Sequence, residues 1–113
     1  MEFQGVGEIV ASRMLHLVDE SGNKHPVSVF IGKPQPAREK SGYECPYQII
    51  GIGSQATSVS HGRDSIEALK TAFVLVGNTL HQLNDELSGK LVWEGAPAGD
   101  LGFPVVLLRS RRV

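Results

Sequence analysis

The stretch that decides the fold is residues 64–87, DSIEALKTAFVLVGNTLHQLNDEL. Its large apolar residues recur at spacings that alternate between three and four, the periodicity of an amphipathic helix. They are Ile66, Leu69, Phe73, Val76, Leu80, Leu83 and Leu87. Asp64 is a suitable N-cap, Glu67 can reach back to complete a capping box, and Gly89 supplies a stop signal. We therefore predict one helix over residues 65–87 whose apolar stripe closes the core.

The remaining surface of this helix carries little charge. No Asp, Glu, Lys or Arg lies between Lys70 and Asp85. A helix that is covered on one face only usually carries charged residues on the other. Val74 and Leu75 lie beside the main stripe, so we expect a second surface to cover the helix, either the chain's own C-terminal part or another subunit.

The preceding half of the chain has the pattern of two β-hairpins. Residues 8–18 and 24–31 form the first pair, and residues 43–52 and 56–61 form the second. Pro46 predicts that the first half of the third strand lies on an edge or at a bulge. The apolar sets that share a face are Ile9, Ala11, Leu15 and Leu17, then Val27, Val29 and Ile31, then Cys45, Tyr47 and Ile49.

The C-terminal part is predicted to be an arm of the same domain. Trp93 and Phe103 are large aromatic residues by which it could dock, and Val105–Leu108 (VVLL) could form a last strand. We expect a single α+β domain over residues 1–113. It has an antiparallel sheet of about four strands, one long helix packed across one face, and a C-terminal arm or extra strand.

Composition and charge exclude several classes of partner. The 113 residues include 11 Lys and Arg against 12 Asp and Glu, and the net charge of −1 gives no general attraction to nucleic acids or acidic membranes. The N-terminus has no signal-peptide pattern, and the longest uncharged stretch is shorter than the ~20 residues of a membrane span. A single cysteine cannot form an intramolecular disulfide. We expect a cytoplasmic protein without a membrane or nucleic-acid partner.

The charge is unevenly distributed along the chain. Arg109, Arg111 and Arg112 lie near the C-terminus, which leaves 11 − 3 = 8 basic residues against 12 acidic ones in residues 1–108. Such a tail could grip phosphates. Three charges without interleaved aromatic residues are more typical of a solvated terminus.

The strongest candidate site is the junction between the fourth predicted strand and the helix, which contains His61, Arg63 and Asp64. Free backbone N–H groups and the positive end of the helix dipole could hold an anion or a phosphate group there. In the simpler interpretation Asp64 fills the cap, Arg63 is solvated and Gly62 allows the turn.

No other pattern is typical of a catalytic, metal or cofactor site. The four histidines share no metal-ligand spacing. Gly51-Ile52-Gly53 lacks the third glycine and the following helix of a dinucleotide-binding loop. Cys45 has no catalytic motif around it and is predicted to be a buried, inert thiol. We expect no cofactor, no metal and no enzymatic activity.

Three segments resemble motifs of a family of small uncharacterised bacterial proteins. They are CPYQIIGIG (45–53), HGRDSIEALKTAF (61–73) and DLGFP (100–104). In that family a Cys-Pro-Tyr/Phe strand, an HG/YG-x-DS-x-x-AL helix start and an Asp-Leu-Gly-Phe-Pro close follow one another. Trp93 matches an aromatic residue that precedes the close. The resemblance covers nearly the whole chain and implies a single domain without naming an activity.

Residues 47–83 also resemble HicB-type antitoxins, in which strands precede a helix that opens with a similar Glu-Ala-Leu. That resemblance implies toxin neutralisation. No segment typical of the family's DNA-binding module follows the helix here, so DNA binding is not implied.

Three functional hypotheses follow. The leading one is a non-enzymatic protein-interaction module, a homodimer or a binder of another protein, with Val74, Leu75, Trp93 and Phe103 as its surface. The first alternative is a small-molecule or anion-binding protein that uses the junction at residues 61–64. The second is a toxin-neutralising antitoxin or an immunity-like protein.

Overall fold

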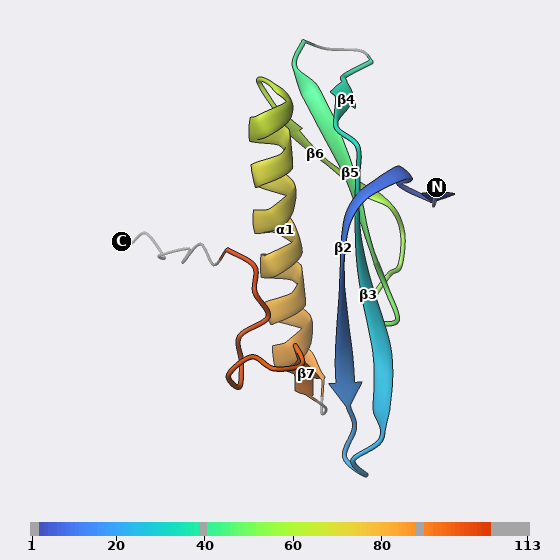
Figure 1. The fold of residues 1–113 in the computed structure, drawn as a ribbon, viewed down its shortest axis with the longest axis vertical. Coiled ribbons are helices and arrows are strands. Elements are labelled where there is room, and N and C mark those ends of the chain that lie inside the picture. The colour runs from blue at the N-terminus through green and yellow to red at the C-terminus, as the bar shows by residue number, and fades with distance from the viewer. Residues whose placement is uncertain (1–2, 39–40, 88–89, 105–113) are drawn as a thin grey trace.

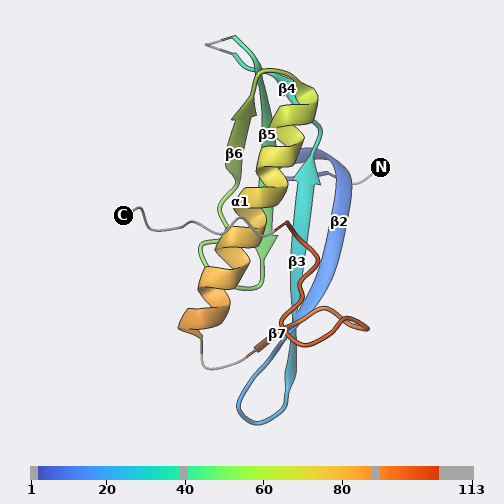
Figure 2. The same ribbon diagram turned by 90° about the vertical axis from the view of Figure 1, so that its left-hand side faces the viewer.

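A single helix lies across one face of an antiparallel sheet in the computed structural model of the chain (Figures 1 and 2), which describes residues 3–38, 41–87 and 90–104. The helix is α1 (Ser65–Glu86). The strands are β1 (Phe3–Gln4), β2 (Gly7–Val18), β3 (Lys24–Gly32), β4 (Gln35–Pro36), β5 (Tyr43–Ile50), β6 (Ser58–Gly62) and β7 (Lys90–Val92). The predicted α+β class is confirmed. The predicted stop at Gly89 lies outside the described residues.

The sheet is built on a meander of four longer strands, because β2, β3, β5 and β6 each pair antiparallel with the next. These are the four predicted strands. The short β7 pairs with β2 and the short β4 with β5, which makes six strands, and β1 pairs with the start of β2 as a seventh. The sheet is therefore larger than predicted, since strands of two or three residues carry no readable alternation.

The prediction that the first half of the third predicted strand, β5, lies on an edge or at a bulge holds only locally, at Pro46, because the rest of β5 has neighbours on both sides. β6 pairs along one side of β5. On the other side β3 pairs with Tyr47–Ile50 and β4 with Tyr43 and Glu44. Pro46 lies between these two ladders, where a residue without an N–H group costs no sheet hydrogen bond.

The core lies between α1 and the side of the sheet that faces it. The sheet contributes Leu15, Val27, Val29, Ile31, Cys45 and Ile49, and the helix contributes Ala68, Ala72, Val76 and Leu80. The buried line on the helix thus differs from the predicted stripe. Ile66 is 67% exposed and Leu87 lies at the C-cap, while Leu69, Phe73 and Leu83 pack at the sides of the core.

The first turn of the helix causes this rotation of the stripe. A Cβ atom built on Gly62 of β6 would overlap the backbone nitrogen of Ala68 and lie 2.6 Å from the carbonyl carbon of Glu67. The helix backbone therefore lies directly against β6, and only a small residue fits at position 68. Ile66 is two residues earlier, about 200° around the helix, and points away from the sheet.

Residues 90–104 fold back over the same molecule as an arm (Figure 2). β7 pairs with the end of β2, and the following segment reaches α1 at Gly77. A Cβ atom there would lie 2.8 Å from the carbonyl oxygen of Pro104 and 3.0 Å from the Cβ atom of Phe103. The chain's own C-terminal part thus covers this flank of the helix. The predicted strand at Val105–Leu108 and the arginine tail lie outside the described residues.

Candidate functional site

Arg13 of β2 holds the arm against the sheet. The central carbon of its guanidinium group lies 3.9 Å from the centre of the Trp93 ring and 4.8 Å from that of Phe103. Its Nη1 atom donates to the carbonyl oxygen of Gly102 at 2.7 Å and lies 3.3 Å from that of Leu101. A guanidinium group suits this position because its planar faces stack on aromatic rings while its edge donates hydrogen bonds.

The Asp-Leu-Gly-Phe-Pro segment has the local structure that this contact needs. The Asp100 Oδ1 atom accepts a hydrogen bond from the Gly102 N–H at 2.9 Å, which closes a tight turn. Gly102 has a φ of +79°, and a Cβ atom there would overlap the Trp93 ring. Only glycine meets both demands. Phe103 then packs on Phe73, with ring centres 6.4 Å apart.

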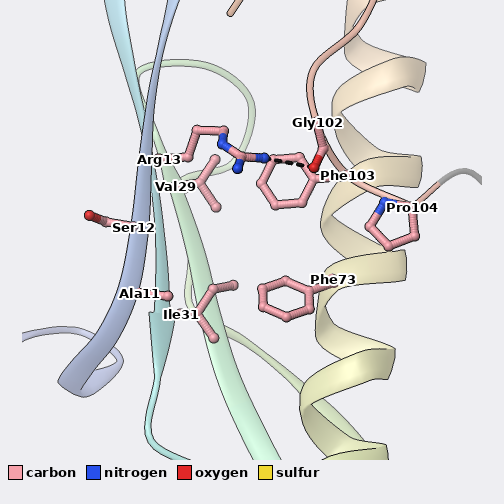
Figure 3. A pocket seen from close by; sticks show the side chains of 9 residues that line it. All are labelled: Ala11, Ser12, Arg13, Val29, Ile31, Phe73, Gly102, Phe103 and Pro104. Carbon is pink, nitrogen blue, oxygen red and sulfur yellow. Dashed lines mark hydrogen bonds between the residues drawn. The ribbon is translucent and has the colours of Figure 1, made fainter.

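A cleft of about 230 Å³ opens between the sheet, α1 and the arm (Figure 3). The residues that line it are Ala11, Ser12 and Arg13 of β2, Val29 and Ile31 of β3, Phe73 of α1, and Gly102, Phe103 and Pro104 of the arm. Most of these side chains are apolar, and none is a carboxylate, imidazole or thiol. The cleft is smaller than the ~300–1,000 Å³ of most ligand pockets. It exceeds the ~150 Å³ that accommodates benzene, so it has room for one or two apolar side chains.

The predicted junction residues have separate roles. The Asp64 Oδ1 atom accepts the Glu67 N–H at 2.8 Å, and the Glu67 Oε1 atom accepts the Arg63 N–H at 2.7 Å. The Arg63 side chain donates to both oxygens of the Glu67 carboxylate, and these hydrogen bonds lower the pKa of Glu67 to about 2. His61 lies on the opposite side of the sheet, with its Nε2 atom 3.5 Å from the Glu44 Oε2 atom. Two carboxylates thus occupy the helix N-terminus, where they would repel an anion.

Gly62 does more than allow a turn at this junction. Its lack of a side chain lets the first turn of α1 rest on β6. The hydroxyl of Ser60 adds a hydrogen bond across the same contact, 2.6 Å from the carbonyl oxygen of Ala68. Residues 60–68 therefore allow the backbone of the first turn of α1 to approach the backbone of β6 closely.

Cys45 is fully buried in the core, as predicted. Burial raises the pKa of its thiol to about 11. The Sγ atom donates to the carbonyl oxygen of Gly32 at 3.4 Å. A thiol in this environment is a poor nucleophile.

Three of the histidines lie near single carboxylates. They are His16 near Glu94, His25 near Asp19 and His61 near Glu44. The described part of the chain contains no group of three His, Cys, Asp or Glu side chains that could hold a metal ion. None of its helices is long and apolar enough to cross a membrane.

A family model matches residues 11–105, a range that begins in β2 and takes in the cleft and the whole arm. The chain belongs to the DUF6968 family. The family is described as a domain of unknown function, so membership supports an uncharacterised domain and assigns no activity. No curated protein and no solved structure matches this DUF6968 chain.

The arm of the DUF6968 domain brings together two of the four residues predicted as an interaction surface. The rings of Trp93 and Phe103 both lie against the guanidinium group of Arg13. Val74 and Leu75 are half-buried on α1. Leu75 is two residues before Gly77, about 200° around the helix, and so lies on the flank opposite the arm.

Sequence reasoning missed Arg13, although the sequence contains a signal for it. Arg13 occupies an inward position of β2, between Ala11 and Leu15 on the face that looks towards α1. A charged residue within an otherwise apolar face needs a partner for its charge. In this DUF6968 chain that partner is the arm.

Among the residues that the structure describes, no helix lies over the side of the DUF6968 sheet away from α1 (Figure 1). On this open face the cross-strand pairs at its centre are Ser12 with Phe30, Met14 with Ser28, Phe30 with Gln48, and Ser28 with Ile50. None of these residues is charged. Met14 is 56% exposed and Val59 of β6 is 41% exposed. The buried Val6 lies over one end of this face, beside Gly32 and Pro46.

Proposed function

We propose that this DUF6968 domain is a non-enzymatic protein-interaction module that binds a second copy of itself through the open face of the sheet. The exposed apolar residues in the uncharged centre of that face carry the proposal. A sheet face that meets water usually carries polar and charged side chains. Exposed apolar side chains gathered on one face are typical of an interaction surface.

We expected a second surface to cover the helix, and on one flank the arm is that surface, so no partner is needed there. Phe103 and Pro104 already lie against Gly77. Met14 and Val59 are exposed apolar residues on the open face of the sheet, and the proposal moves the interface from the arm side of the helix to that face.

The uncharged centre of this face favours a second copy over a charged partner. Two copies have the same net charge of −1, so they associate best through a surface that carries no charge of its own. A twofold axis through the face brings the same residues together from both copies. Four strands ~4.8 Å apart, with five residues each at ~3.3 Å, give roughly 300 Å² per copy in projection. The total of roughly 600 Å² for the two copies is below the ~1,200 Å² of a standard interface, so the proposed dimer is weak and reversible.

Two features support the absence of catalysis. The Cys45 thiol is buried with a raised pKa, and Glu67 and Asp64 are engaged at the helix N-terminus. The anion-binding alternative at residues 61–64 is disfavoured by these two carboxylates. Toxin neutralisation rests on sequence resemblance alone.

Sedimentation equilibrium across the micromolar range tests the dimer. We expect a monomer–dimer equilibrium in the native chain and a monomer in Met14→Glu, because a buried carboxylate at the centre of the interface is costly. Ile66→Glu is the matched control, since Ile66 is still more exposed but lies on α1. Circular dichroism checks that both variants fold. A native chain that stays monomeric throughout the range, or an equal effect of both substitutions, would refute the proposal.

A further inference from the structure

The cleft beside the arm combines apolar walls with one positive charge. Ile31 and Phe73 lie at one end of the cleft, and the guanidinium group of Arg13 lies at the other (Figure 3). Arg13 is half-buried, and a guanidinium group is not deprotonated in proteins. Ligand sites typically have mostly apolar walls and a few polar groups that fix the orientation of the ligand. The cleft therefore suits a ligand that has an apolar body and a negative charge at one end.

The described part of the chain stabilises the charge of Arg13 without neutralising it. The contacts of its guanidinium group are two backbone carbonyl oxygens of the arm and the rings of Trp93 and Phe103. None of these groups has a formal charge. No carboxylate among the described residues forms an ion pair with Arg13. A charge beside apolar surface is usually paired with an opposite charge, so the position of a counter-ion is open at this end of the cleft.

One edge of the guanidinium group is suited to such a counter-ion. Both hydrogen bonds that Arg13 donates within the described ranges use its Nη1 atom. The Nε–H group and the adjacent N–H of Nη2 form the other edge of the fork. Two parallel donors of this kind match the two oxygens of one carboxylate, and such bidentate pairs are short and strong. The arm thus fixes the orientation of Arg13 through Nη1 and leaves the carboxylate-binding edge without a described partner.

The volume of the cleft limits the size of the ligand. It is about 230 Å³, against the ~150 Å³ that accommodates benzene, so a single ring with a short acidic group fits. We propose that the cleft binds a small apolar carboxylate, an aromatic or branched-chain acid, with its carboxylate on Arg13 and its apolar body against Ile31 and Phe73. This site is separate from the proposed dimer interface, because Arg13 and Met14 point to opposite faces of β2.

Nitrogen–proton correlation NMR of the full chain, titrated with phenylacetate, tests this site. We expect saturable shifts of the Ala11, Ile31 and Phe73 amides and of the Arg13 Nε–H signal. For a ligand of about ten non-hydrogen atoms the Kd should be on the order of 0.1–1 mM. Phenylacetamide has the same shape without the charge, and acetate has the charge without the ring. Each should bind at least about tenfold more weakly than phenylacetate.

Two substitutions on neighbouring positions of β2 locate the ligand. Ala11 is an exposed residue on the wall of the cleft, so Ala11→Leu reduces the space for the ligand and should raise the Kd at least about tenfold. Ser12→Leu is the matched control, because the Ser12 side chain points away from the cleft (Figure 3), and it should change the Kd by less than about twofold. The spectra themselves show whether each variant folds. If Ala11→Leu does not fold, the comparison of phenylacetate with phenylacetamide still decides.

Four results would overturn the proposal. They are an absence of saturable shifts at concentrations about tenfold above the expected Kd, shifts confined to another surface, equal binding of phenylacetamide, and equal weakening by Ala11→Leu and Ser12→Leu. N-acetyl-L-valine carries the same carboxylate on a mimic of a protein C-terminus. If it binds more tightly than phenylacetate, the cleft recognises the end of a protein chain, which also refutes a small free acid as the ligand.

The Met14→Glu variant separates this site from the proposed dimer. It should bind phenylacetate with a Kd within about twofold of the native value, since Met14 lies on the other face of the sheet. Loss of phenylacetate binding in this folded variant would contradict the separation of the two sites. A chain that binds phenylacetate but stays monomeric would refute the dimer alone.

Discussion

Replacing Gly77 by alanine tests whether the arm is docked on the helix, because helix propensity and packing predict opposite signs. In an uncovered helix, alanine in place of an interior glycine stabilises the protein by about 0.5–1 kcal/mol. Here the added Cβ would lie 2.8 Å from the Pro104 carbonyl oxygen and 3.0 Å from the Phe103 Cβ. Overpacking of this kind costs about 1–3 kcal/mol. We therefore expect a net loss of about 1–2 kcal/mol.

Urea unfolding measures this loss through two probes. Circular dichroism follows the helix, and the fluorescence of Trp93, the only tryptophan, follows the arm. With a slope of about 1–3 kcal/mol per M, the midpoint of unfolding should fall by about 0.3–2 M. Thr79→Ala is the matched control on an exposed position of α1 and should raise stability by a few tenths of a kcal/mol, about what its propensity predicts. Suppose instead that Gly77→Ala stabilises the protein by the amount expected for an uncovered helix and leaves the Trp93 emission unchanged. The arm then does not lie against Gly77.

Three further outcomes are expected. Gly62→Ala should destabilise the protein by about 3 kcal/mol or more, since its Cβ meets the helix backbone at Ala68; an unchanged urea midpoint would contradict that contact. Cys45 should resist thiol reagents at mildly alkaline pH in the folded chain and react on unfolding, because burial raises its pKa to about 11; labelling of the native protein at the rate of a free thiol would show that it is accessible. Glu67 has a folded pKa of about 2 against an ordinary value of 4.5, so its contribution to stability is complete above pH 4.5 and is lost as the pH falls towards 2. Thermal unfolding of Glu67→Gln should show a smaller acid-induced decrease than the native chain, and parallel curves would refute this assignment.

The elements that the sequence predicts well are those whose pattern is local and repeated. Residues 8–18 and 24–31 alternate, and they appear as β2 and β3 within one residue of the predicted ends. The helix prediction of 65–87 differs from α1 by one residue, because the Asp64 cap and the apolar spacing are both encoded nearby. Periodicity alone, however, predicts that Ile66 lies in the core. It contains no information on the contact with Gly62, which turns the face with Ala68 and Ala72 towards the sheet.

The candidate site was less predictable because its residues act across long separations in the chain. Arg13 and Gly102 are joined by a hydrogen bond that spans 89 positions. Gly77 looks like an unfavourable helix residue until the position of Pro104 is known. Trp93 and Phe103 were identified as anchors by their size, but a single sequence does not reveal which surface such anchors meet.

The manner in which Arg13 is held has a consequence for the environments in which the arm stays in place. Its charge is balanced by two carbonyl oxygens and two ring faces, and no carboxylate in the described ranges forms an ion pair with it. Dissolved ions weaken attraction between exposed opposite charges far more than contacts of this kind, which are short and partly shielded from water. The docking of the arm on Arg13 should therefore depend little on ionic strength. We expect the arm to stay docked in concentrated salt as well as in dilute buffer.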